Sequence, residues 1–186
     1  MKIVLGGSRH LEFIPGELKE RVSEWIDSST EFLVGDAPGT DRAFQALLRL
    51  SNYSAVTVFT SSETARNNLG KWPVNRVDSG LKSKSNAVHA FKDREMCNQA
   101  DAGLMIWDCK SAGTLSNLID LVQQDKQCYI WVAPDSELYK FDHSNSLDKW
   151  IAGYPESRDE AMKRLLTFRK RAKKIEKAIS QPDLFG

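Results

Sequence analysis

The chain has 186 residues, with 26 Lys and Arg against 25 Asp and Glu, and 41% of its residues are hydrophobic. This balance is typical of a globular protein that can bury a core, and it excludes the collagen-like, disordered and disulfide-stapled classes. No apolar run approaches the roughly 20 residues that a membrane-spanning helix needs. Three scattered cysteines, Cys97, Cys109 and Cys128, are typical of a reducing compartment. We therefore expect a cytoplasmic protein without a metal, a cofactor or a membrane segment, and a homo-oligomeric assembly is left open.

Positive charge is concentrated near the C-terminus. Residues 158–186 contain nine Lys or Arg and four Asp or Glu, whereas the rest of the chain contains 17 and 21. A basic helix with its charges at 158–177 would attract the phosphate backbone of DNA through counterion release. A solvated helix face without a partner explains the same charges, so composition alone does not choose between the two.

Hydrophobic periodicity predicts alternating strands and helices. Short apolar or β-branched runs predict strands at 2–5, 32–34, 55–59, 103–107 and 128–132. Apolar stripes at helical spacing predict helices at 15–26, 43–50, 89–99 and 114–124, the second capped by Thr40 or Asp41. We expect an α/β, Rossmann-like, mainly parallel sheet with helices on both faces and a C-terminal basic helix. The predicted strand order is 3-2-1-4-5.

The chain divides into four predicted segments. Residues 1–133 form a ligand-binding domain, 134–157 an irregular linker, 158–180 the basic helix and 181–186 a tail. Inside the domain, residues 61–87 lack periodicity and are predicted to form a long polar loop. In that loop Arg66 and Lys71 could contact phosphate, and Trp72 could either stack on a base or pin the loop to the domain surface.

Glycine-containing turns follow three of the predicted strands. They are Gly6-Gly7-Ser8-Arg9, Gly35-Asp36-Ala37-Pro38-Gly39-Thr40-Asp41 and Lys110-Ser111-Ala112-Gly113-Thr114. Because ligands bind outside the carboxyl ends of parallel strands, we expect these turns to converge there on an anion. Glycine lets backbone N–H groups approach the anion, and the last turn would open a helix whose N-terminus attracts negative charge. Each turn also has a purely backbone explanation, and for Asp41 we prefer helix N-capping.

The three turns resemble the SLOG superfamily of Rossmann-like proteins. That group includes the cytokinin-activating LOG phosphoribohydrolases, the DNA-processing protein A family and nucleotide sensors. The resemblance is to a bacterial branch, covers roughly residues 1–133, and extends to Ala65-Arg66-Asn67-Asn68, Gly70-Lys71-Trp72 and Lys92-Asp93-Arg94-Glu95-Met96. It implies a nucleotide or an ADP-ribose-like ligand. It implies that the phosphate lies on Gly113-Thr114 and on the Gly7-Ser8-Arg9 turn. Together with the other turn and loop residues, the candidate ligand-binding residues are Gly7, Ser8, Arg9, Gly35, Asp36, Arg66, Arg94, Ser111, Gly113 and Thr114.

One position departs from the phosphoribohydrolase pattern. Those members carry Gly-Thr-x-x-Glu, whereas this chain has Asn117 at the glutamate position. An amide can neither act as a base nor stabilise a cationic transition state by charge. We therefore expect a sensor or regulatory module that binds its ligand. The alternatives are an N-glycosidase or phosphoribohydrolase with Asp36 as the catalytic residue, where Asp41 and Asp93 are the other candidate carboxylates, and a DNA-binding protein of the DNA-processing type.

The last residues, Gln181-Pro182-Asp183-Leu184-Phe185, resemble the bacterial sliding-clamp-binding motif Gln-x-x-Leu-Phe. The resemblance implies that Gln181, Asp183, Leu184 and Phe185 contact a clamp. Burying the Leu184-Phe185 pair in a partner pocket would contribute about 3–6 kcal/mol before ordering costs. The alternative is that the pair folds back onto the parent domain.

Overall fold

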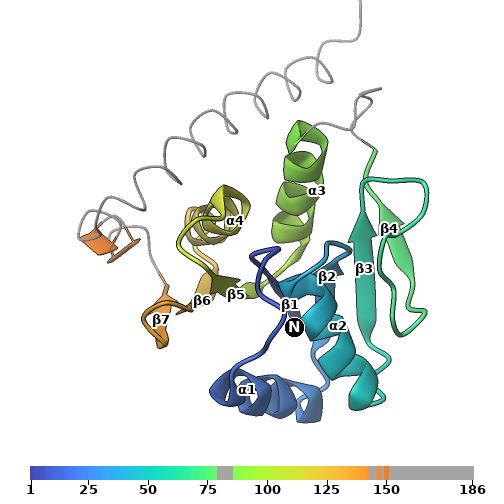
Figure 1. Cartoon of the computed structure of the whole chain (residues 1–186), viewed down its shortest axis with the longest axis horizontal. Coiled ribbons are helices and arrows are strands. Elements are labelled where there is room, and N and C mark those ends of the chain that lie inside the picture. The colour runs from blue at the N-terminus through green and yellow to red at the C-terminus, as the bar shows by residue number, and fades with distance from the viewer. Residues whose placement is uncertain (79–85, 143–145, 148, 151–186) are drawn as a thin grey trace, which may run out of the picture.

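The computed structural model describes residues 1–78, 86–142, 146–147 and 149–150. In that part of the chain it shows an α/β fold around one seven-stranded, mostly parallel sheet (Figure 1). The strands lie in the order β4-β3-β2-β1-β5-β6-β7. They are β1 (Lys2–Gly7), β2 (Glu31–Gly35), β3 (Val56–Thr60), β4 (Val74–Arg76), β5 (Ala102–Trp107), β6 (Gln127–Val132) and β7 (Glu137–Phe141).

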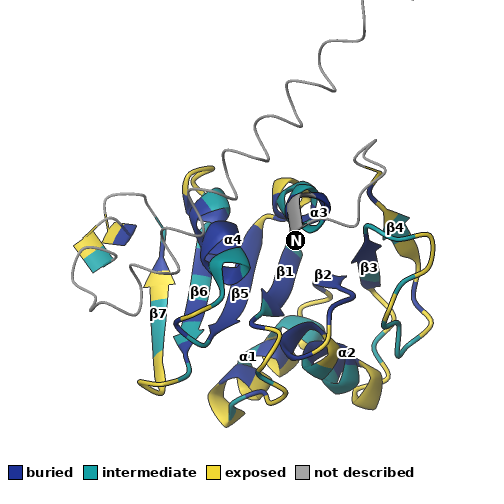
Figure 2. Cartoon of the chain, turned by 45° about the horizontal axis from the view of Figure 1, so that its top comes forward, coloured by how far each residue is buried: buried dark blue, intermediate teal, exposed yellow. Residues whose placement is uncertain are grey.

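Helices cover both faces of the sheet, as the sequence predicts. They are α1 (Gly16–Asp27), α2 (Thr40–Leu50), α3 (Asn86–Gln99) and α4 (Ala112–Val122). Figures 1 and 2 show α1 and α2 on one face and α3 and α4 on the other. Each face has its own core, because the α1 side chains Leu18 and Val22 belong to one buried cluster and the α4 side chains Leu118 and Leu121 to another.

The predicted strand order is confirmed. The five expected strands correspond to β1, β2, β3, β5 and β6, and their spatial order, β3-β2-β1-β5-β6, is the predicted one. The register aligns their ends, since Leu5 pairs with Val34 and Gly7 pairs with Ile106. The residues that follow β1, β2 and β5 therefore emerge at the same edge of the sheet.

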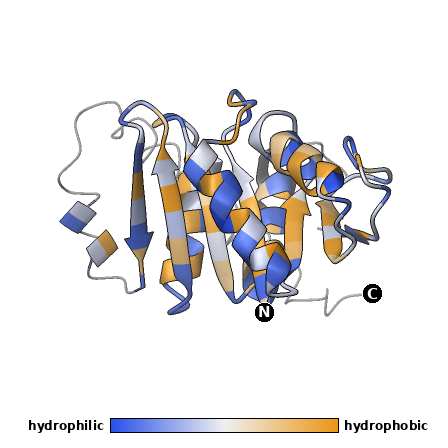
Figure 3. Cartoon of the chain, turned by 90° about the horizontal axis from the view of Figure 1, so that it is seen from below, coloured by the Kyte–Doolittle hydropathy of each residue, from blue (hydrophilic) through white to orange (hydrophobic). Residues whose placement is uncertain are grey.

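Two strands were missed, one at each edge of the sheet. The short strand β4 lies in the segment predicted as a polar loop and pairs with β3 in parallel; three residues are too few for a periodicity signal. The second, β7, lies in the predicted linker and pairs antiparallel with β6. Figure 3 shows β7 as mostly hydrophilic, as suits an edge strand, and its Phe141 ring packs against Trp150 at 5.2 Å.

The C-terminal predictions fall outside the described residues. Both the basic helix at 158–180 and the tail at 181–186 belong to the part of the chain that the structure leaves undescribed. Among the helices that are described, none has the length and apolar character needed to cross a membrane.

Among the glycines that the structure describes, Gly39 combines a positive φ with a backbone contact that leaves no room for a side chain. It precedes α2 with φ +77, and a Cβ there would lie 2.2 Å from the backbone oxygen of Arg9. We expect Gly39→Ala to lower the free energy of unfolding by about 1–3 kcal/mol, because the backbone conformation and the contact both disfavour a side chain. Urea unfolding measures the loss.

Gly16→Ala is the matched control for this substitution. Gly16 is the first residue of α1, and a Cβ there meets nothing within 4 Å. We expect a change within about 0.5 kcal/mol, so equal losses in the two variants would contradict the role assigned to Gly39.

Candidate functional site

The turns after β1 and β5 are hydrogen-bonded to each other at the carboxyl edge of the sheet. The Ser8 hydroxyl donates to Asp108 Oδ1 at 2.8 Å and lies 3.5 Å from Thr114 Oγ1. On its other side, the Ser8 carbonyl accepts a hydrogen bond from Thr40 Oγ1 at 2.9 Å. The predicted convergence of the three turns is therefore observed, with the buried Ser8 at its centre.

The N-terminus of α4 is capped by the chain itself. Ser111 is the N-cap, and its hydroxyl accepts from both the N–H (3.3 Å) and the hydroxyl (2.9 Å) of Thr114. The Asp108 carboxylate accepts from the backbone N–H groups of Lys110 at 2.9 Å and Ser111 at 2.8 Å. A negative charge thus already lies beside the helix end where a phosphate was expected, next to Gly113.

Asp108 was missed as a residue of this edge. Asp108 directly follows the predicted strand at 103–107, and aspartate at the start of a turn favours an Asx turn, so this signal was available in the sequence.

Asp36 is fully engaged by the end of β3 and by the loop that follows it. It is 1% exposed and accepts hydrogen bonds from Thr60 Oγ1 at 2.9 Å and from the Arg66 backbone N–H at 3.1 Å. Arg66 also donates from Nε at 3.1 Å and from Nη2 at 2.7 Å. Burial pushes the pKa of Asp36 up, but the hydrogen bonds from Arg66 and the charge of Lys92 outweigh burial and hold the pKa at about 2. The two predicted site residues form one ion pair, and its geometry suits anchoring the loop better than catalysis.

Asp41 is not the helix cap that the sequence favoured. The N-cap is Gly39, and no side chain caps the helix there. Instead the buried Asp41 carboxylate accepts the backbone N–H of Ala37 at 3.2 Å. A Cβ on Gly35 would lie 2.2 Å from Asp41 Oδ2 and 3.1 Å from Lys92 Nζ. Gly35 therefore makes room for two buried charged groups.

Lys92 brings a buried cation from α3 to the same place. Its ammonium is 2.8 Å from Asp93 Oδ1, and Lys92 is 2% exposed. Burial alone would lower the pKa of Lys92, but the charges of Asp93 and Asp41 raise it above its ordinary value. For Asp41, burial raises the pKa to about 6 against the opposing charge of Lys92. We call Asp36, Asp41, Arg66, Lys92 and Asp93 the inner ion cluster.

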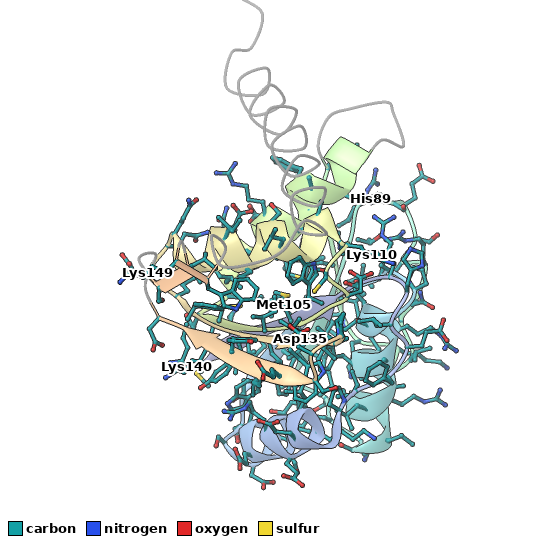
Figure 4. All side chains as sticks on the ribbon, turned by 60° about the vertical axis from the view of Figure 1, so that its left-hand side comes forward. His89, Met105, Lys110, Asp135, Lys140 and Lys149 are labelled. Atoms are coloured by element: carbon teal, nitrogen blue, oxygen red, sulfur yellow. The ribbon has the colours of Figure 1, made fainter. Side chains whose placement is uncertain are left out.

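Two further predicted residues, Arg9 and Arg94, lie on the loop after β1 and on α3. Arg9 is exposed on the loop after β1, and Arg94 is half-buried on α3. His89, which was not predicted, lies one turn before Lys92 on α3, and its Nδ1 is 2.8 Å from the Ser61 hydroxyl. Figure 4 shows His89 and Lys110 on the same side of the molecule. The spacing of His89, Lys92 and Asp93 (i, i+3, i+4) is the helical signal that could have marked this face.

Trp72 pins its loop and does not offer a free stacking surface. It is buried, and its indole N–H donates to the Tyr53 carbonyl at 2.8 Å. The pocket beside it, about 270 Å³, lies toward the opposite edge of the sheet, where α2 ends and β3 begins. Its lining residues are Arg49, Asn52, Tyr53, Leu69, Gly70, Lys71 and Trp72.

A scan of the chain against protein-family models gave no match, and comparisons with curated proteins and with solved structures gave none either. Within the described residues, no group of three or more His, Cys, Asp or Glu side chains is placed to hold a metal ion.

Asp41→Asn tests the charge state of the inner ion cluster. The folded pKa of about 6 lies above the ordinary 3.8, so the proton stabilises the folded protein at low pH and this contribution is lost as pH rises through 6. Between pH 4.5 and pH 8, we expect wild type to lose on the order of 2 kcal/mol of unfolding free energy relative to the variant.

Urea unfolding of both proteins at the two pH values gives this difference. A difference that stays constant with pH would show that Asp41 does not take up a proton on folding.

Proposed function

We propose that this chain is a SLOG-like binding module that takes a nucleotide or an ADP-ribose-like molecule as a sensor or regulator. The supporting observation is the direct contact between the turns after β1 and β5, where Ser8 Oγ and Thr114 Oγ1 are 3.5 Å apart. In the observed strand order, β1 and β5 are the neighbours at which the chain reverses its direction across the sheet. Open α/β sheets bind ligands at this switch point.

Binding without bond cleavage is favoured by the state of the carboxylates. A hydrolase needs an acid, a base or a nucleophile that can reach the reacting bond. The Asp36 carboxylate is instead taken up by Thr60 and Arg66. Asn117, at the position of the phosphoribohydrolase glutamate, is a buried amide on α4. These features support a sensor over a conventional hydrolase.

N-glycosidic hydrolysis is a second candidate, and one observation favours it. Asp41 has a pKa of about 6, in the range where a carboxylic acid can donate a proton near neutral pH. In that mechanism Asp41 takes over the role first considered for Asp36. It would protonate the leaving base as the N-glycosidic bond breaks. Water would add to the sugar carbon, and the proton that this water loses would return to the Asp41 carboxylate.

A nucleotide panel separates the two candidates. At a ligand concentration of about 100 times the dissociation constant, a sensor should melt about 5–10 °C higher, with no free base released. Thr114→Val should reduce the shift, because Thr114 Oγ1 lies beside Ser8 at the switch point, whereas Arg49→Ala, at the opposite edge, should retain it. Release of free base that is lost in Asp41→Asn would favour hydrolysis instead. A panel without any shift or product would contradict both.

We also propose that the C-terminal segment recruits this domain to DNA. The support is in the sequence alone: the basic charges at 158–177 and the clamp-like tail Gln181-Pro182-Asp183-Leu184-Phe185. The positive segment would lie along the phosphate backbone while the tail occupies the clamp pocket.

Deleting residues 181–186 tests the tail. We expect the full chain to co-elute with a bacterial sliding clamp in size-exclusion chromatography and the truncated chain to elute separately, because the Leu184-Phe185 pair supplies the buried apolar surface. The double substitution Leu184→Ala/Phe185→Ala is the matched control for chain length and should behave like the deletion. Co-elution that survives both changes would refute clamp binding.

A further inference from the structure

Three basic residues from separate parts of the fold lie near the carboxyl edge, where Arg66 pairs with Asp36, His89 contacts Ser61, and the charges of Arg66 and Arg9 act on His89. Arg9 follows β1, Arg66 follows β3, and His89 lies near the start of α3. Arg9 is exposed, and His89 is half-buried. Because these parts are far apart in sequence, only the folded sheet brings the three together.

In the Arg66–Asp36 ion pair, the Arg66 side chain is partly exposed to solvent and the Asp36 side chain is buried. The Asp36 side chain is 1% exposed, whereas that of Arg66 is 35% exposed. The two side-chain hydrogen bonds to Asp36 use Nε and Nη2. A guanidinium has five N–H donors, so Arg66 has three left for an anion, in an orientation that Asp36 fixes.

His89 lies near cationic side chains from three parts of the fold. Its Nδ1 is occupied by the Ser61 hydroxyl at 2.8 Å, which leaves Nε2 for another partner. Burial lowers the pKa of His89, and the charges of Arg66 and Arg9 lower it further. Lys92 acts in the same direction, and the charge of Asp93 opposes them. An arriving anion would therefore be drawn to this place and would favour the protonated imidazole.

The N-terminus of α4 is a less favourable binding position for that anion than the surroundings of His89. The Asp108 carboxylate accepts the N–H groups of Lys110 and Ser111 there, and Ser111 caps Thr114. A second negative charge would have to approach this carboxylate closely, which costs free energy in a partly buried setting.

We propose that Arg9, Arg66 and His89 form an anion subsite for a phosphate ester or pyrophosphate group, and that His89 takes up a proton when the anion binds. This subsite deepens the proposed function and rests on it, since it says where the charged part of the nucleotide-derived ligand lies. Asp36 is then a positioning residue, because it acts on the ligand only through Arg66.

Proton uptake fixes the direction of the pH dependence. A ligand that raises the pKa of a histidine binds more tightly as pH falls. The groups that face His89 are Ser61 and Arg66 after β3, Arg9 after β1, and Lys92 and Asp93 on α3. Asp41 also gains a proton near pH 6 and lies in the same cluster, so its contribution has to be measured separately.

Isothermal titration with ADP-ribose at pH 6 and pH 8 tests the subsite. This probe suits the purpose because its pyrophosphate is esterified on both sides and lacks the proton that phosphate monoesters lose near pH 6. Wild type should bind several-fold more tightly at pH 6. Arg9→Ala should weaken binding about tenfold at both pH values, which is about 1.4 kcal/mol.

His89→Gln should weaken binding at pH 6 and remove most of the pH dependence, because glutamine keeps a polar contact with Ser61 but cannot gain a proton. Asp41→Asn should keep most of the pH dependence of binding, and Arg49→Ala should bind ADP-ribose like wild type. Arg9 is exposed, so its variant tests the subsite even if His89→Gln unfolds.

The outcomes distinguish the subsite from the function on which it rests. ADP-ribose that binds equally to wild type, Arg9→Ala and His89→Gln would overturn the subsite and leave nucleotide binding intact. A second outcome is that inorganic pyrophosphate binds, with a tenfold weaker affinity in Arg9→Ala, whereas ADP-ribose does not bind. This result would support the subsite and contradict the proposal that the ligand is derived from a nucleotide. Absence of binding by both probes would overturn the subsite.

Discussion

The ion pair between Asp36 and Arg66 organises the carboxyl edge of the sheet. Asp36 is buried directly after β2, where a lone carboxylate would be costly, and Arg66 supplies both side-chain and backbone donors to it. The pair therefore holds the loop after β3 over the end of β2. Asn67 reinforces this contact, since its side chain donates to the Asp36 carbonyl at 2.9 Å. Breaking the pair would leave a buried charge without compensation, so the loop is held firmly at the site that we propose for the ligand.

The inner ion cluster is balanced only when Asp41 is protonated. Asp36 and Asp93 then match Arg66 and Lys92, so four charged groups cancel. An ionised Asp41 adds one uncompensated negative charge in a buried place, which is why burial raises its pKa to about 6. The charge of this edge thus changes near pH 6. An anionic ligand would therefore bind more tightly when Asp41 is protonated.

Much of the fold could be predicted from the sequence, because buried parallel strands and amphipathic helices have strong periodic signals. The five central strands and the convergence of the turns at Ser8, Asp36 and Thr114 follow from this periodicity and from the topology rules. The edge strands could not be predicted in this way, since β4 is short and β7 is mostly polar.

The partners of the charged side chains were also beyond sequence reasoning. Nothing local indicates that Asp36 meets Arg66 thirty residues later, or that Lys92 is buried under Gly35. Such pairings depend on how loops and helices pack over the strand ends.

The glycines of the second turn show that a glycine-containing turn after a strand, although typical of phosphate sites, can serve contacts within the protein instead. Gly35 leaves space for the Asp41 carboxylate and the Lys92 ammonium, and Gly39 leaves space for the backbone of Arg9. Both glycines therefore serve close packing inside the protein, and neither needs a ligand to explain it. Their effect on binding is indirect, because they let the turns pack closely enough for side chains from three elements to lie near one edge of the sheet. Of the three residues in the proposed anion subsite, Arg9, Arg66 and His89, the glycine pattern points only to Arg9.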